Sequence, residues 1–593
     1  MKTLDEILLT VEKPSRYIGG ECGEPNIKKE KFNYCICFPD VYEVAMSNLG
    51  IRIVQEVING VDGAMADRCF APWPDFGSAL KENQIPLYSL GLRLPLNEFD
   101  MLGFSLQFEL SYTTVLYMLD LAGIPLYAKD RGDNYPIIQG GGPCAVNPEP
   151  IADFFDIFVI GDGEDAMREL AMLKLKTTNK AEFLQKATEI EGVYVPSLTY
   201  PVYDENGKII RFEGKRVRRA ICLDLENATY PKTQTVGNVE AVHDRAVIEV
   251  MRGCFRGCRF CQAGFIYRPV RQKSVDNLTK TACALIRSTG FDTLSMNSLS
   301  TSDYKDLKPL LNSLKENLPK NTKISLPSLR IDSFDEFYAQ EARKNSLTFA
   351  PEAGTQRLRD VINKDITDDD IKTGAEKAFK LGYSLIKLYF MMGLPTETED
   401  DIAGIRRIIE GIREIYAQNP KRLRGLRINV SLSTFVPKPF TPFQWEEFIS
   451  FEQFKDKLDT VKKHLFAKGV TVSWNDYETS ELEVALARGD RNLSKVICNA
   501  YKKGCISDSW GDFFSAEKWN LAFEQEGVEK QTYKSVINTN DLLAWDFLDV
   551  GVSKDFLLKE KERAEKGLIT GGCQTGCKAC GLQKDCPIVN KGV

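Results

Sequence analysis

The stretch "RGCFRGCRFCQAG", residues 252–264, places cysteines at positions 254, 258 and 261 with no fourth cysteine near them. The apolar run "RAVIEVMRG" (245–253) precedes them and predicts a strand that ends at the first cysteine. Structural zinc sites use four protein ligands, whereas three thiolates on a [4Fe–4S] cluster leave one iron open to another ligand. The chain has only two histidines, His243 and His464, and neither is within reach by local spacing. The spacing therefore favours an iron–sulfur cluster with one open coordination position.

Five more strand-like segments follow the cysteines, and helical patterns separate them. They are "TLSMNSLS" (293–300), "KISLPSLRI" (323–331), "SLTFAPEAG" (346–354), "LIKLYFMMGLP" (385–395) and "RINVSLSTFVP" (427–437). Six βα units are fewer than the eight of a closed barrel, so residues 241–450 predict a partial, TIM-like (β/α)6 barrel. Its active face lies in the loops after the strands, where the cysteines follow the first one.

Residues 1–194 show a separate βα alternation. Strand-then-turn segments occur at "KFNYCICFPD" (31–40), "FDMLGFSLQFE" (99–109), "DNYPIIQGGGP" (133–143) and "DIFVIGDGE" (156–164). This pattern predicts an α/β, Rossmann-like domain with a parallel sheet covered on both faces. The glycine-rich turns fall at the carboxyl ends of the strands, where such sheets bind ligands.

The remaining regions carry weaker signals. Residues 195–240 predict a linker with a small β segment turning at "DENGK", residues 451–569 a mostly helical region, and residues 570–593 a Cys-rich tail. The net charge of −6 neither favours nor forbids binding to RNA, and it does not favour binding to an anionic membrane surface. Without an apolar stretch of membrane-spanning length or a secretory signal at the start, we expect a cytoplasmic protein with reduced thiols.

The cysteine loop resembles the radical S-adenosylmethionine (radical SAM) superfamily, whose motif is CxxxCxxC with an aromatic residue before the last cysteine. Cys254, Cys258, Phe260 and Cys261 fit this motif. The resemblance implies that the open iron of a [4Fe–4S] cluster chelates S-adenosylmethionine. One electron, from a donor such as flavodoxin or ferredoxin, then cleaves the sulfur–carbon bond to give a 5′-deoxyadenosyl radical that acts on a substrate.

The later loops resemble the part of this machinery that binds S-adenosylmethionine. The residues implied as contacts are Phe260, Ser298, Ser300, Arg330, Glu352, Gly354, Gly393 and Leu394. Arg330 is a planar cation suited to a carboxylate, and Gly354 would allow a close approach. A role as a helix cap or turn residue stays open for each polar residue in this set.

A narrower resemblance points to the cobalamin-binding-domain subgroup, and within it to an uncharacterised bacterial family. It is carried by "GGGPCAVNPEPIADFFDIFVIGDGE" (140–164), the cysteine loop and "FVPKPFTPFQW" (435–445). It implies cobalamin contacts at Ser105, Gly140, Gly141 and Gly142, although these glycines also suit tight βα turns. Many cobalamin domains ligate cobalt through a histidine, and this chain has none before position 243. Cobalamin would therefore bind without imidazole, or the domain has kept the fold and lost the cofactor.

The tail places Cys573, Cys577, Cys580 and Cys586 within a short glycine-rich segment. Four local thiolates suit a second iron–sulfur cluster or a structural zinc knuckle, and free reduced thiols stay open as a third alternative.

Together these features predict a radical SAM enzyme, of transferase type if cobalamin binds, because methylcobalamin can pass a methyl group to a carbon radical. Methylthiolation, ring rearrangement and other radical modifications stay open. The alternatives are a methylthiotransferase-like enzyme acting on RNA or protein, and a non-catalytic cobalamin or iron–sulfur sensor. No residue of the sequence identifies the substrate.

Overall fold

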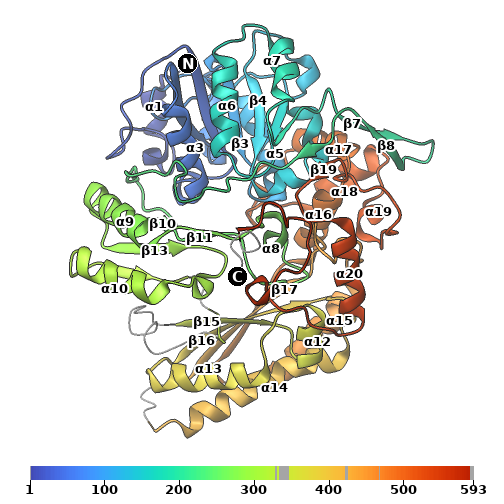
Figure 1. Cartoon of the computed structure of the whole chain (residues 1–593). Helices are drawn as coiled ribbons and strands as arrows, with labels where there is room; N and C mark the ends of the chain where they lie inside the picture. The colour runs from blue at the N-terminus through green and yellow to red at the C-terminus, as the bar shows by residue number, and fades with distance from the viewer. Residues whose placement is uncertain (1, 328–329, 333–345, 421–424, 466–467, 588–593) are drawn as a thin grey trace.

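The N-terminal part of the protein is built on a six-stranded sheet in the order β2-β1-β3-β4-β5-β6 (Figure 1). The structure is a computed structural model that describes residues 2–327, 330–332, 346–420, 425–465 and 468–587. Its strands are β1 (Phe32–Phe38), β2 (Ala64–Phe70), β3 (Met101–Ser105), β4 (Ile137–Gly141), β5 (Ile157–Val159) and β6 (Val193–Tyr194). All neighbours are parallel except β6, which is antiparallel to β5.

Both faces of this sheet are buried, as the sequence predicted for a doubly covered sheet. In β1, Tyr34 and Ile36 belong to one hydrophobic core, whereas Cys35 and Cys37 belong to another on the opposite face. Successive side chains of a strand point to opposite faces, so a strand buried on both sides reads as a continuous apolar run. The helices of this region are α1 (Leu4–Leu8), α2 (Tyr42–Ala45), α3 (Leu49–Asn59), α4 (Pro74–Glu82), α5 (Tyr112–Leu121), α6 (Glu164–Lys174) and α7 (Lys180–Ala187).

Two further parallel sheets follow. The first is β10 (Ala246–Glu249), β13 (Thr293–Asn297) and β14 (Lys323–Ser325); the second is β15 (Leu347–Glu352), β16 (Leu385–Met392), β17 (Arg427–Thr434) and β18 (Val470–Trp474). Their helices are α9 (Val275–Thr289), α10 (Leu307–Asn317), α12 (Gln356–Val361), α13 (Asp368–Lys380), α14 (Glu399–Gln418) and α15 (Phe451–Leu465). Figure 1 shows the N-terminal sheet at the top, the first of these sheets at the centre left and the second at the bottom.

The sequence predicted six strands here, and the structure has a seventh, β18, in the region predicted to be helical. β18 pairs with β17 at the edge of the second sheet, and most of its side chains are exposed. An exposed edge strand lacks the apolar run by which buried strands are recognised. In the described residues the two sheets are not hydrogen-bonded to each other, so the partial barrel is divided between β14 and β15.

The C-terminal region packs back onto the N-terminal sheet. Its elements are α16 (Tyr477–Arg488), α17 (Leu493–Lys502), α18 (Ala516–Gln525), α19 (Lys530–Lys534), β19 (Leu548–Asp549) and α20 (Lys554–Glu565). Residues of α17 and α5 share one hydrophobic core, and β19 pairs with β9 (Val217–Arg218). The predicted turn at "DENGK" joins the antiparallel strands β7 (Tyr200–Tyr203) and β8 (Ile209–Glu213).

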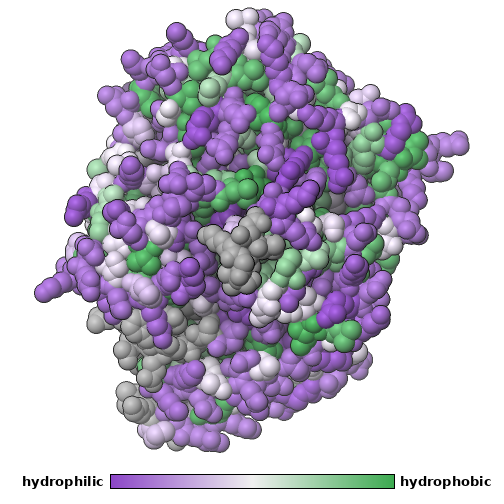
Figure 2. All heavy atoms as spheres, in the orientation of Figure 1, coloured by the Kyte–Doolittle hydropathy of each residue, from purple (hydrophilic) through white to green (hydrophobic). Residues whose placement is uncertain are grey.

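The outer surface is mostly polar on the face drawn in Figure 2. Among the described helices, none is both long and apolar enough to cross a membrane.

Candidate active site between the N-terminal sheet and the cysteine loop

The loop that carries Cys254, Cys258 and Cys261 lies between β11 (Met251–Arg252), which pairs with β12 (Arg271–Gln272), and α8 (Ala263–Ile266). All three thiols are partly buried. The Cys261 amide donates to the Cys258 carbonyl over 3.1 Å. The Arg256 amide donates to Sγ of Cys254 over 3.4 Å. These contacts turn the loop tightly around the three sulfurs.

The thiols of this loop suit a cluster that replaces their protons. Burial, with a smaller contribution from the neighbouring thiols of the loop, raises the pKa of Cys254 to about 11 and that of Cys261 to about 12. Metal binding must therefore release these protons. Each thiolate of a [4Fe–4S] cluster binds a different iron, so three thiols in one loop can hold three of its irons.

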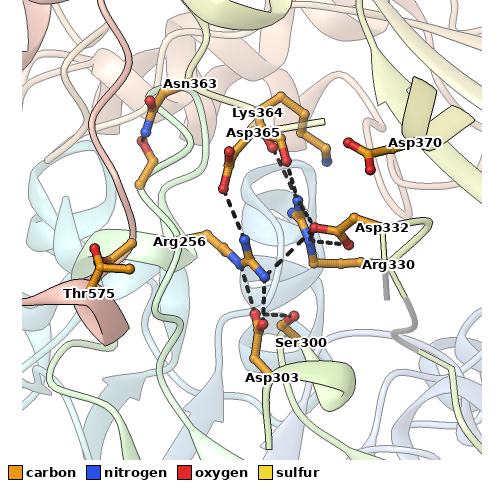
Figure 3. A network of polar contacts seen from close by, with 12 residues as sticks. Arg256, Ser300, Asp303, Arg330, Asp332, Asn363, Lys364, Asp365, Asp370 and Thr575 are labelled. Atoms are coloured by element: carbon orange, nitrogen blue, oxygen red, sulfur yellow. Dashed lines mark hydrogen bonds and ion pairs between the residues drawn. The ribbon is translucent and has the colours of Figure 1, made fainter. Parts of the chain in front are cut away.

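Arg256, between the first two cysteines, links the loop to two predicted S-adenosylmethionine contacts (Figure 3). Its Nη2 lies 2.6 Å from Oδ1 of Asp303, and Ser300 donates to the other oxygen of that carboxylate over 2.7 Å. Arg330 pairs with Asp332 over 3.1 Å, and Asp332 lies 3.8 Å from Arg256. The structure thus brings Ser300 and Arg330 to the cysteine loop. Neither Arg256 nor the two aspartates had been singled out from the sequence.

Glu352, a predicted contact, ends β15 in a left-handed conformation with φ of +67°. A non-glycine residue rarely adopts this region, and when it does it often belongs to a functional site. Its Oε1 accepts a hydrogen bond from Nζ of Lys364 over 2.9 Å. Burial alone would lower the pKa of Lys364, but Glu352 and the Cys258 thiol raise it above its usual value. Lys364 therefore places a cation between the carboxylate and the loop, 5.8 Å from the Phe260 ring centre.

Of the four remaining predicted contacts with S-adenosylmethionine, Gly354, Gly393 and Leu394 occupy packing positions in this structure. A Cβ at Gly354 would lie 2.2 Å from the backbone oxygen of Asp401 in α14, so the close approach here is between two backbones. Gly393 has φ of +83°, which favours glycine. Leu394 is buried in a hydrophobic cluster against which Phe260 packs. Ser298 pairs instead with the hydroxyl of Thr301 over 2.8 Å.

A cavity of about 400 Å³ separates the N-terminal sheet from the cysteine loop. One wall is the carboxyl edge of the sheet, where Ser105, Gly141 and Gly142 line it; Ser298, from the loop after β13, lines the facing wall. Gly140 faces elsewhere, because a Cβ there would lie 2.5 Å from the ring of Phe158. Three of the four predicted cobalamin contacts thus share one cavity with a residue of the first barrel sheet.

The cavity also has polar lining that the sequence reading missed. Tyr34 donates to Oε1 of Gln139 over 2.5 Å, and both side chains line the cavity. A Cβ at Gly103 would lie 1.6 Å from the Tyr34 hydroxyl, so only glycine leaves room for this pair. Alternation along β1 and β4 could have suggested that these residues share a face.

Arg252 joins the two walls of the cavity. Its guanidinium lies 3.0 Å from Asp162 and 2.7 Å from Glu164, both in the turn between β5 and α6, and 2.9 Å from Glu249 at the end of β10. Burial alone would raise the pKa of Asp162, but Arg252 and then Arg271 lower it to about 2. The acidic turn "GDGE" therefore binds directly to the residue two positions before Cys254.

The first tail cysteine, Cys573, lies beside this loop. The amide of Cys573 donates to the carbonyl of Phe255 over 2.9 Å. Cys577 is exposed, whereas Cys573, Cys580 and Cys586 are partly buried.

A three-cysteine loop after the first strand of a parallel βα series, with a cation and carboxylates around it, defines an α/β enzyme of radical type. Residues 248–409 match the family model for the radical SAM superfamily, and residues 50–196 match the model for the N-terminal region of radical SAM proteins. The chain belongs to the radical SAM superfamily, and it is an enzyme of that class.

Two individual proteins are similar to it. An uncharacterised protein of Methanocaldococcus jannaschii is 29% identical over 503 residues, which cover 84% of this chain and 98% of that protein. The structure of the radical S-adenosylmethionine methyltransferase TsrM from Kitasatospora setae, with cobalamin and a [4Fe–4S] cluster bound, matches with a TM-score of 0.44 and 14% identity. That match covers 68% of this chain and 74% of the other, and its score is too low to establish a common fold.

Proposed function

We propose that this radical SAM enzyme binds a cobalamin in the cavity beside the cysteine loop and methylates a substrate that reaches the same space. The observation that carries the proposal is the position of the cavity. It lies at the carboxyl edge of a Rossmann-like sheet, where such sheets bind cofactors, and its other wall comes from the loops after β10 and β13. A corrinoid held there would face the S-adenosylmethionine side of the enzyme.

The lining fits a corrinoid that has no imidazole ligand. Gly141 and Gly142 bring bare backbone to the cavity, and Ser105 adds a hydroxyl. The lining has no histidine, and its ionised groups are engaged, since Arg252 binds Asp162 and Glu164. We assign Ser105, Gly141 and Gly142 as cobalamin contacts and place Gly140 beneath them as a packing residue.

Within the radical SAM part, Cys254, Cys258 and Cys261 would hold the [4Fe–4S] cluster. When bound, the cluster and S-adenosylmethionine supply a 5′-deoxyadenosyl radical, and cobalamin supplies the methyl group. Arg330 binds Asp332 and the backbone carbonyls of Lys364 and Asp365, and its planar cation is the group that we assign to the carboxylate of S-adenosylmethionine. Lys364, bound to Glu352, holds positive charge on the side of the loop that carries Cys258.

The other S-adenosylmethionine assignments follow from these positions. Ser300 and Glu352 lie on the cysteine-loop side, and Ser298 lies on the cavity side. We therefore assign Ser300 and Glu352 to the methionine or ribose part of the ligand, and Ser298 to the boundary between ligand and cavity. Phe260, Gly393 and Leu394 form the apolar support for the adenine, and Gly354 fixes the loop that carries Glu352.

The domain layout of the proposal keeps the boundaries expected from the sequence. The cobalamin domain is 1–194, the linker 195–240, the radical SAM core 241–450, the helical region 451–569 and the tail 570–593.

The test reconstitutes the full chain anaerobically with iron, sulfide and hydroxocobalamin. We expect a corrinoid that survives gel filtration and has a spectrum without imidazole coordination. Gly141→Leu should abolish its retention, because Cβ of residue 141 would lie 3.3 Å from the Gln139 side chain, at the cavity wall. Gly132→Leu is the matched control, because a Cβ there meets nothing within 4 Å. A corrinoid that washes off the unaltered chain would refute cobalamin binding.

The cluster assignment has its own test. Replacing Cys254, Cys258 and Cys261 with alanine should abolish formation of 5′-deoxyadenosine from S-adenosylmethionine, because no other thiols occupy this loop. Undiminished cleavage in that variant would refute the assignment and leave corrinoid binding untouched.

A further inference from the structure

The C-terminal tail runs alongside the cysteine loop from Thr570 to Cys573. Asn363 donates to the carbonyls of Gly257, in the loop, and Thr570, both over 3.0 Å. The side-chain oxygen Oδ1 of Asn363 accepts a hydrogen bond from the Thr570 amide over 2.8 Å. The Cys573 amide then donates to the carbonyl of Phe255, the neighbour of Cys254. The start of the tail is therefore fixed against the loop by the Asn363 side chain and by one backbone hydrogen bond.

The far end of the tail is fixed as well. The Ser553 amide donates to the Cys580 carbonyl over 2.9 Å. Leu582 is only 3% exposed, and Asp585 pairs with Arg218 over 2.5 Å. The start of the tail and its stretch from Cys580 to Asp585 are therefore both held to the body of the protein.

The tail repeats a local feature of the first loop. The Ala579 amide donates to Sγ of Cys577 over 3.4 Å, just as the Arg256 amide donates to Sγ of Cys254 over 3.4 Å. Hydrogen bonds to sulfur are one of the means by which proteins tune iron–sulfur clusters. Cys573, Cys577 and Cys580 also have the same CxxxCxxC spacing as Cys254, Cys258 and Cys261, and this shared spacing is the reason for assigning iron to the tail.

We propose that Cys573, Cys577, Cys580 and Cys586 hold a second iron–sulfur cluster, of [4Fe–4S] type, that passes electrons to the first. Four thiolates close the coordination, so this cluster has no iron open to a substrate. Cys577 is exposed, whereas Cys573 packs on the core around Phe255, so the second cluster lies between solvent and the first.

The proposed step is a one-electron transfer in which no bond forms or breaks. An external low-potential donor of the flavodoxin or ferredoxin class is oxidised by one electron, and the tail cluster is reduced. The tail cluster is reoxidised when it reduces the first cluster. This inference rests on the radical SAM activity but is independent of corrinoid binding, and its test contains no corrinoid.

The test compares three variants of the full chain after anaerobic reconstitution with iron and sulfide. We expect about eight irons in the unaltered chain and about four in Cys577→Ser/Cys580→Ser. The loop variant, with alanine at 254, 258 and 261, should also hold about four. Cys22→Ser/Cys283→Ser, outside both groups, is the matched control with about eight. Zinc in the tail, or an iron content unchanged by the tail substitutions, would overturn the proposed site.

Two readouts test the relay. After reduction with dithionite, the electron paramagnetic resonance spectrum of the unaltered chain should differ from the sum of the two single-cluster variants, because adjacent paramagnetic clusters interact. With reduced flavodoxin as donor, 5′-deoxyadenosine formation should fall several-fold in the tail variant. With dithionite, which is small enough to reach the loop itself, 5′-deoxyadenosine formation in the tail variant should not fall.

Additive spectra, or an unchanged flavodoxin-driven rate, would overturn the relay. If the double variant also loses the dithionite-driven reaction, Cys577→Ser alone, at an exposed position, decides between these outcomes.

Discussion

Replacing Arg252 with methionine should loosen the connection between the N-terminal domain and the cysteine loop. Methionine keeps much of the side-chain length but removes the guanidinium. The Arg252 side chain is 13% exposed, and its partners Asp162, Glu164 and Glu249 are 4%, 4% and 12% exposed. The substitution therefore leaves three mostly buried carboxylates, with Arg271 still bound to Asp162.

The size of the effect follows from this burial. Removing one partner of a buried ion pair costs on the order of 3–5 kcal/mol, because the other charge stays buried without compensation. The matched control is Arg168→Met, which breaks an exposed pair with Asp165 whose side chains are 41% and 67% exposed. Such exposed pairs contribute about 1 kcal/mol or less. Thermal unfolding followed by circular dichroism should therefore separate the two variants clearly.

The pH dependence gives a second readout. In the unaltered chain the pKa of Asp162 is about 2, below its usual 3.8, so its ionisation adds stability above pH 3.8 that is lost as the pH falls through 2. Removing Arg252 raises that pKa. The destabilisation should therefore be greatest at neutral pH and should shrink as the carboxylates become protonated. A decrease in the unfolding temperature of Arg252→Met that is no larger than that of Arg168→Met, or that does not depend on pH, would refute this account of the interface.

Two further substitutions test other parts of the structure. Gly354→Ala should cost on the order of 1–3 kcal/mol in unfolding free energy and weaken S-adenosylmethionine binding, because its Cβ would lie 2.2 Å from the Asp401 backbone. Gly411→Ala on α14, where a Cβ meets open space, should instead stabilise the chain slightly; equal effects would contradict the packing argument. Burial raises the pKa of Asp508 to about 6, although the hydrogen bond from Thr113 opposes this shift. The protonated side chain therefore stabilises the folded state fully below pH 3.8, and this stabilisation is lost as the pH rises through about 6. Between pH 3.8 and pH 6 the unfolding free energy of Asp508→Asn should therefore vary by about 3 kcal/mol less than that of the unaltered chain, as measured by urea denaturation at each pH. The same dependence of the urea midpoint on pH in both proteins would contradict this prediction.

The sequence predicted those parts of the structure that depend on local pattern. The strand before Cys254 and the doubly buried β1 carry continuous apolar runs, and such runs report burial wherever they occur. The hairpin at "DENGK" follows from turn chemistry over five residues. The exposed edge strand β18 offered neither signal.

The parts of the site that escaped prediction depend on contacts between distant segments. Arg252 and Glu164 are 88 residues apart in the chain, and no local spacing relates them. Lys364 follows Glu352 by twelve residues, and only the fold of the loop after α12 brings its ammonium back to that carboxylate. The sequence also does not distinguish Gly140 from the two glycines after it, whereas in the structure a Cβ on Gly140 would meet the ring of Phe158, and Gly141 and Gly142 line the cavity.

Charge pairs connect the N-terminal domain to several later regions of the chain. Besides Arg252, the partly buried Lys438 after β17 binds Glu109, from the N-terminal domain, over 2.7 Å and Glu483 of α16 over 2.8 Å. Glu149 pairs with Arg491, at the start of the C-terminal helices, over 2.9 Å. Because breaking a buried pair is far more costly than keeping it, these links resist sliding of the N-terminal sheet over the radical SAM sheets. In the proposed reaction a group moves between two cofactors, and charge pairs that cross the interface at several points would keep the separation between those cofactors fixed.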